Sequence, residues 1–141
     1  YLATAAARMI RPVWHRSLDK QEILGPMEQV FLNIVLNAFD VVQNSDSPSI
    51  KINVFTELMT KVIVDISDNG KGIANDDIQY LFDPFFTTKD TGTGLGLSIV
   101  HQIVSDHQGK ITVHETSSDG TTFRVVLPKL LRSKTVVKEK T

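Results

Sequence analysis

Residues 90–100, with the sequence DTGTGLGLSIV, constrain the fold more than any other stretch of the chain. Gly92, Gly94 and Gly96 alternate with other residues and lead into the apolar pattern of a helix. Glycine lets a backbone approach a ligand closely and adopt a positive φ at little cost, and the N–H groups at a helix N-terminus suit phosphate. The stretch therefore predicts a loop that runs into a helix. Taken alone, a flexible loop and a phosphate site fit it equally well.

A helix with a polar stripe is predicted at residues 27–42, after the Gly-Pro pair at 25–26, because proline suits the first helical position. Gln29, Asn33 and Asn37 are four residues apart and therefore share one face of this otherwise apolar helix. Asparagine is a poor residue for a helix interior. The stripe indicates a site for a metal or a phosphate, or else a solvated face.

Two β-hairpins are predicted at residues 50–66 and 110–127, where apolar and polar residues alternate. The first hairpin runs directly into the sequence DNGKGI, which begins at Asp68. Asp68 is in phase with the inward-facing residues of the second strand. An inward carboxylate needs a hydrogen-bond donor, which a ligand or the following Asn-Gly turn would supply.

The segment between the hairpins carries a phenylalanine-rich stretch, LFDPFFTTK, at residues 81–89. A short helix with Asn75 as its cap is expected before it. The three phenylalanines fit either an apolar clasp on a mobile lid or ordinary core packing. Lys89 stands next to the glycine loop, within reach of a phosphate. A second helix is predicted over residues 97–107 and ends before Gly109.

The composition limits the possible classes of protein. With 41% hydrophobic residues, 141 residues suffice for one domain with a core, and a net charge of −1 favours neither nucleic acid nor an anionic membrane. The chain has no cysteine and no apolar run near the roughly 20 residues of a membrane span. We expect a helix over residues 1–17, one domain over residues 1–131 and a basic tail at 132–141. Because the chain begins with Tyr1, we also expect a fragment of a longer protein.

Taken in their order along the chain, these signals resemble the ATP-binding catalytic domain of two-component sensor histidine kinases. That domain shares its fold with gyrase, heat-shock chaperone and mismatch-repair ATPases. The resembling motifs are the N box from Gln29 (QVFLNIVLNA), the first glycine box from Asp68 (DNGKGI), the F box from Phe82 (FDPFFTTK), the second glycine box from Gly92 (GTGLGL) and the closing strand from Gly120 (GTTF). The resemblance covers residues 26–128. It implies a two-layer α/β sandwich, with a mixed, largely antiparallel sheet covered on one face by about three helices.

The resemblance also implies that the chain binds Mg²⁺-ATP and transfers the γ-phosphoryl group to a histidine. Asn37 would ligate Mg²⁺, Asp68 would accept a hydrogen bond from the adenine amino group, and Lys89 would add positive charge near the phosphates. Asn33 would position the reacting end of the nucleotide. The other implied nucleotide contacts are Gly70, Gly72, Ile73, Gly92, Gly94, Leu95, Gly96, Leu97 and Thr121.

The sequence departs from the family pattern at two positions of the predicted site. Asp40 takes a place near a phosphate that is often basic in the family, so Lys89 would have to supply more of the positive charge there. Asn33 stands where the gyrase-like and chaperone-like ATPases carry a catalytic glutamate, which favours phosphoryl transfer over hydrolysis.

The acceptor histidine is not expected in this chain. His15 lacks the flanking residues of the family's acceptor, and His107 matches a position with a structural role. The resemblance therefore implies a separate dimerisation and phosphoacceptor domain of the same parent, a homodimeric parent and a response regulator as partners. It implies a cytoplasmic location for this domain and leaves open a membrane-anchored parent. The alternatives are a Ser/Thr kinase of the same fold, of the anti-sigma-factor type, and a nucleotide-binding module without transfer activity.

Overall fold

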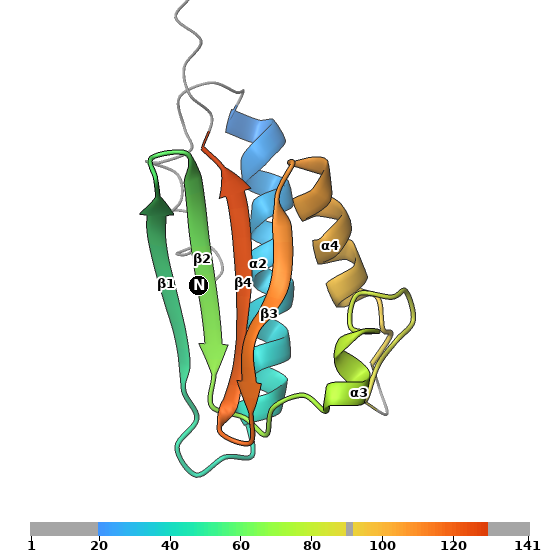
Figure 1. Ribbon diagram of the computed structural model, residues 1–141. Helices are drawn as coiled ribbons and strands as arrows, with labels where there is room; N and C mark the ends of the chain where they lie inside the picture. The colour runs from blue at the N-terminus through green and yellow to red at the C-terminus, as the bar shows by residue number, and fades with distance from the viewer. Residues whose placement is uncertain (1–19, 90–91, 130–141) are drawn as a thin grey trace, which may run out of the picture.

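One antiparallel sheet with the strand order β1-β2-β4-β3 forms a layer of the computed structural model (Figure 1). The strands are β1 (Ile50–Glu57), β2 (Lys61–Asp68), β3 (Lys110–Ser117) and β4 (Gly120–Pro128). The structure describes residues 20–89 and 92–129. The two hairpins join through β2 and β4, where Asp68 lies opposite Thr121. Every pairing within these described residues is antiparallel, so the parallel component of the expected mixed sheet is not found there.

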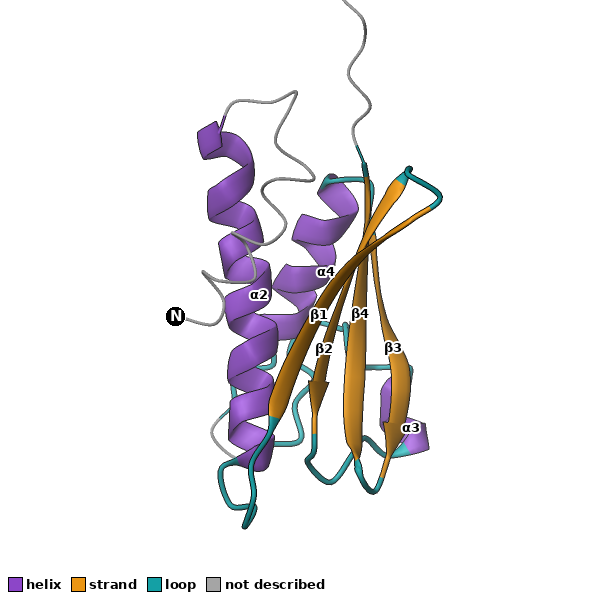
Figure 2. Ribbon diagram, turned by 90° about the vertical axis from the view of Figure 1, so that its left-hand side faces the viewer, coloured by secondary structure: helices purple, strands orange, loops and turns teal. Residues whose placement is uncertain are grey.

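The helices α2 (Lys20–Val42) and α4 (Gly96–Asp106) lie side by side against one face of the sheet (Figure 2). The single turn α3 (Asn75–Ile78) follows β2. The two-layer sandwich expected from the motifs is thus confirmed. None of the described helices is long and apolar enough to cross a membrane.

The core lies between the helices and the two inner strands. Alternation along β2 and β4 turns every second side chain toward the helices. The most deeply buried strand residues are Val62, Val64 and Ile66 of β2 and Val125 and Leu127 of β4. They pack against residues such as Phe31 of α2 and Val100 of α4, which have no exposed surface. Burial of each such side chain contributes about 1.5–3 kcal/mol, and together they hold the inner strand β2, which ends at Asp68, in place against the helices.

The start predicted for the helix at residues 27–42 was wrong. α2 begins at Lys20 and passes through Gly25 and Pro26. Proline disfavours a helical residue before it partly because it clashes with the Cβ of that residue. Gly25 has no Cβ to clash with the ring of Pro26, and the helix continues through both residues.

Other boundaries differ by a few residues. Ala74, not Asn75, is the N-cap of α3, and no side chain caps that turn. The first hairpin is longer than expected and turns at Leu58 and Met59, both with positive φ (49° and 60°) and 86% and 68% exposed. The expectations for residues 1–17 and 132–141 lie outside the described residues.

Candidate functional site

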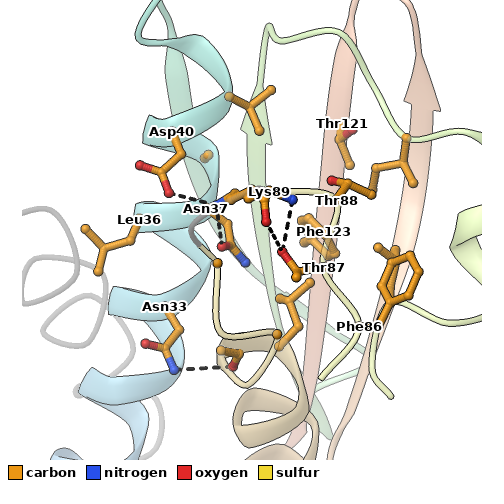
Figure 3. Close-up of a pocket in the computed structure, with 18 of the residues that line it drawn as sticks. Asn33, Leu36, Asn37, Asp40, Phe86, Thr87, Thr88, Lys89, Thr121 and Phe123 are labelled. Atoms are coloured by element: carbon orange, nitrogen blue, oxygen red, sulfur yellow. Dashed lines mark hydrogen bonds and ion pairs between the residues drawn. The ribbon is translucent and has the colours of Figure 1, made fainter. Parts of the chain in front are cut away.

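A cavity of about 360 Å³ opens between α2, the adjoining ends of the inner strands β2 and β4, and the segment that leads to the glycine loop (Figure 3). Most of the residues predicted for the site line it, although they come from distant parts of the chain. These residues are Asn33, Asn37, Asp68, Gly72, Ile73, Lys89, Gly92, Gly94, Gly96, Leu97 and Thr121. The sequence motifs therefore meet around one space.

Two predicted contacts do not line the cavity. Gly70 is buried, and a side chain there would overlap Val41 of α2, so this glycine lets the loop after β2 pack on the helix. Leu95 is the N-cap of α4.

Asp68 ends β2 with its carboxylate at the cavity wall. Oδ1 accepts a hydrogen bond of 2.9 Å from the N–H of Gly70. Burial raises the pKa of the Asp68 carboxyl above its ordinary value of 3.8, and hydrogen bonds from backbone N–H groups of Gly70 and Thr121 partly oppose the rise. The turn after β2 therefore supplies one donor to Asp68, and the carboxylate also faces the cavity.

Two threonine hydroxyls tie the loop after β2 to the second hairpin. Thr121 is 5% exposed, and its Oγ1 lies 3.0 Å from Oγ1 of Thr116. The Thr116 hydroxyl oxygen also accepts a 2.9 Å hydrogen bond from the N–H of Ile73. Sequence reasoning missed Thr116, and the strand register, which pairs it with Thr121, would have found it.

Gly72 has a backbone reason to be glycine. Its φ is +79°, and a Cβ there would overlap the backbone carbonyl of Ser117. The close approach of these two loops shapes the wall of the cavity near Ile73.

Two residues of the polar stripe of α2, Asn33 and Asn37, face the cavity from the opposite side, whereas Gln29 is exposed and does not line it. Asn33 Nδ2 donates a 3.3 Å hydrogen bond to the carbonyl oxygen of Gly96, at the start of α4. Lys89 Nζ donates to Oδ1 of Asn37 at 3.2 Å and to Oδ2 of Asp40 at 2.7 Å (Figure 3). The stripe therefore holds both the glycine loop and the lysine before it.

The phenylalanine-rich segment divides its three aromatic side chains among three environments. Phe82 packs against the core, Phe86 lines the cavity and Phe85 is 75% exposed. Phe85 has a φ of +68°, which costs a residue other than glycine about 1–3 kcal/mol. Its N–H donates to the carbonyl oxygen of Gly94 at 2.9 Å, so the segment is tied to the glycine loop.

Apart from Phe86, which was considered for an apolar clasp, no site role was predicted for the other apolar and hydroxyl residues that line the cavity. These residues are Leu36, Ala38, Val41, Leu81, Phe86, Thr87, Thr88, Thr93 and Phe123. Leu36, Ala38, Val41 and Phe123 follow a helix or strand pattern that also fits simple core packing. The others lie in turns and loops, where periodicity gives no signal.

The oxygen donors of the cavity fit a magnesium ion whose ligands come partly from the protein and partly from a nucleotide. The described residues contain no cluster of three His, Cys, Asp or Glu residues that would hold a metal alone. Mg²⁺ usually keeps several waters and binds one or two protein oxygens together with substrate phosphates. The amide oxygen of Asn37, beside the glycine loop, suits that arrangement.

Known proteins match this chain over the same region. The model of the histidine kinase-, DNA gyrase B- and HSP90-like ATPase family matches residues 24–131. Sensor histidine kinase ZraS of Escherichia coli K12 is 41% identical over 102 residues, which cover 72% of this chain and 21% of that protein. Sporulation kinase E of Bacillus subtilis is 36% identical over 102 residues, covering 72% of this chain and 14% of that protein. The chain thus spans about a fifth or less of these relatives.

Solved structures agree with the sequence matches. A nucleotide-free form of the catalytic domain of histidine kinase ThkA superposes with a TM-score of 0.67 at 38% identity, covering 76% of this chain and 68% of that one. The chain belongs to the histidine kinase-, DNA gyrase B- and HSP90-like ATPase family. Within that family it is an ATP-binding catalytic domain of the sensor histidine kinase type.

Proposed function

We propose that this domain binds Mg²⁺-ATP in the cavity and transfers the γ-phosphoryl group to a histidine on a separate dimerisation and phosphoacceptor domain. One observation carries the proposal: Asn37 and Lys89 meet beside the glycine loop, in the same cavity that Asp68 and Thr121 line. The volume of about 360 Å³ lies within the range of small-molecule sites.

Each side of the cavity has its own task in this proposal. Asp68 accepts from the adenine amino group, with Thr121 beside it, while the backbone of the glycine loop receives the phosphates. Asn37 ligates Mg²⁺ and Lys89 neutralises phosphate charge. ATP supplies the phosphoryl group, with ADP as its leaving group, and positioning and charge neutralisation provide most of the catalysis.

The partners follow from the missing acceptor. The parent would be a homodimer whose acceptor domain receives the phosphoryl group and passes it to a response regulator in two-component signalling.

Asn33 donates a hydrogen bond to the carbonyl oxygen of Gly96 and is not a base. Water would therefore be activated poorly, and hydrolysis of ATP would be slow compared with transfer.

Radiolabelled ATP tests the proposed transfer. We expect no label on this chain alone and acid-labile label on an added phosphoacceptor domain from a sensor kinase relative. Transfer should be slow and proportional to acceptor concentration, because tethering within one protein normally supplies a local concentration in roughly the millimolar range. Acid-stable label on the chain itself would instead support the Ser/Thr kinase alternative, and binding without any transfer would support the module without activity.

Acidification should weaken nucleotide binding through Asp68. The carboxylate accepts from the adenine amino group only when it is ionised, and its pKa is raised. The contribution of Asp68 is therefore present above the raised pKa and lost as the pH falls through it. We expect affinity for a fluorescent ATP analogue to fall with pH more steeply in the wild type than in Asp68→Asn. Protonation of the phosphates is common to both proteins, so parallel curves would remove Asp68 from adenine recognition.

A further inference from the structure

The ammonium group of Lys89 occupies the position of a cation between two oxygens of α2. It lies 3.2 Å from Oδ1 of Asn37 and 2.7 Å from Oδ2 of Asp40 (Figure 3). One of these oxygens is the ligand assigned above to Mg²⁺. Lys89 and the metal therefore compete for the same amide oxygen.

The ion pair between Lys89 and Asp40 is easily broken, so another cation can replace the ammonium group. The two side chains are 36% and 48% exposed, and solvated ion pairs of this kind are weak. Lys89 lines the cavity together with Thr87 and Thr88, which precede it in the same segment. Moving the ammonium group thus costs little and takes place within the site.

We propose that Asn37 Oδ1 and Asp40 Oδ2 form a shared cation position, which Lys89 occupies in the nucleotide-free domain and Mg²⁺ takes over when nucleotide binds. This inference rests on the proposed binding of Mg²⁺-ATP. Asn37 contacts the metal directly, and Asp40 binds its water shell, because Mg²⁺ retains several waters in protein sites. Lys89 is released toward the phosphates. Asp40 is thus a positioning residue that couples metal binding to the lysine.

The exchange gives Asp40 opposite effects with and without metal. Without Mg²⁺, its negative charge lies beside the phosphates and holds Lys89 away from them, so it weakens binding. With Mg²⁺, its charge is compensated by the metal. Asp40 therefore sets how strongly nucleotide affinity depends on Mg²⁺.

Titration of a non-hydrolysable fluorescent ATP analogue, in EDTA and over a Mg²⁺ series, tests this for Asp40→Asn. In EDTA we expect the variant to bind about fivefold more tightly than the wild type, the effect of removing one charge near the phosphates. At saturating Mg²⁺ the two should agree within about twofold, so the enhancement by Mg²⁺ falls about fivefold. An enhancement equal to that of the wild type would overturn the proposal.

Lys89→Met, alone and together with Asp40→Asn, separates exchange from simple charge neutralisation. Without the competing ammonium group, half-maximal enhancement should need about threefold less Mg²⁺ than in the wild type, the effect of removing a weak solvated ion pair. Removing a positive charge near the metal would by itself also lower this concentration. The exchange further requires that Asp40→Asn lose most of its effect in EDTA when Lys89 is already Met, because Asp40 acts through the lysine. An effect of Asp40→Asn that is unchanged in the Lys89→Met background would overturn the exchange. Asp106→Asn is the matched control, because Asp106 is an exposed helix carboxylate that contacts Gln102 and does not line the cavity.

The same data distinguish failure of this inference from failure of the proposed function. If the wild type binds no nucleotide, both are overturned. If Asn37→Ala loses the Mg²⁺ enhancement while Asp40→Asn keeps it, the nucleotide site stands and the shared cation position does not.

Discussion

Asn37→Ala is expected to weaken Mg²⁺-dependent nucleotide binding by about 100-fold or more, since even loss of a group that only supports a metal ligand costs about 10–100-fold. The described residues contain no group of three His, Cys, Asp or Glu residues that would hold the metal without Asn37. The fold should remain intact, because Asn37 is half-buried at the cavity and its side chain contacts Lys89. Alanine is also a better helix former than asparagine. Titration of a fluorescent ATP analogue with and without Mg²⁺ measures the change.

Gln29→Ala is the matched control for this variant. Gln29 belongs to the same helical stripe, two turns earlier, but it is exposed and does not line the cavity. It should bind Mg²⁺-nucleotide as the wild type does, and thermal unfolding of both variants should stay near that of the wild type. An Asn37→Ala protein with unchanged affinity would remove the metal role from the stripe.

The layers of the fold could be predicted because each element carries its own pattern. Alternation in residues 50–66 and 110–127 gave both hairpins, and the apolar positions of α2 gave its buried face. The start of α2 was mispredicted, because proline usually marks a helix boundary. At position 26 the preceding residue is Gly25, which has no Cβ to clash with the proline ring, and the helix continues.

Contacts that depend on the strand register were not accessible to local patterns. Asp65 is an outward-facing residue of β2, yet it is only 9% exposed. Arg124, its partner in the register of β4, donates Nε and Nη2 to the two carboxylate oxygens at 2.8 and 2.7 Å, and its guanidinium lies 5.5 Å from the ring centroid of Phe55. Bidentate pairing of this kind needs a defined geometry. It follows only once β2 and β4 are known to be neighbours.

The site was predicted in its parts but not in its connections. Asn37, Asp68 and the glycine loop stood out in the sequence. Asparagine is unfavourable inside a helix, a carboxylate is unfavourable on the inward face of a strand, and three alternating glycines are unusual before a helix. The contact of Lys89 with Asp40 joins residues 49 positions apart in sequence, and no local sequence pattern predicts it. The departure at Asp40 looked like a missing positive charge, whereas in the folded chain it is the partner of Lys89.

Gly72→Ala is expected to lower the free energy of unfolding by about 2 kcal/mol or more, because φ in the left-handed region costs a residue with a Cβ about 1–2 kcal/mol before any overlap is counted. Here the φ is +79° and the new methyl group would overlap the carbonyl of Ser117. Relief requires the loop after β2 to move away from the β3–β4 turn, which displaces Ile73 and strains its hydrogen bond to Thr116. Nucleotide binding should therefore fall together with stability. Chemical unfolding and analogue titration on the same samples measure the two effects.

Gly96→Ala provides the contrast in stability, since a Cβ at Gly96 meets nothing within 4 Å and the residue is the first of α4. It should unfold at the same denaturant concentration as the wild type or slightly above it. The comparison also separates two reasons for Gly72 to be glycine. If Gly72→Ala unfolds like the wild type but no longer binds nucleotide, the missing side chain makes room for the nucleotide, with which the family resemblance implies a contact of Gly72. If stability and binding are lost together, the backbone carbonyl of Ser117 is the reason, and the wall of the cavity depends on how closely these two loops approach.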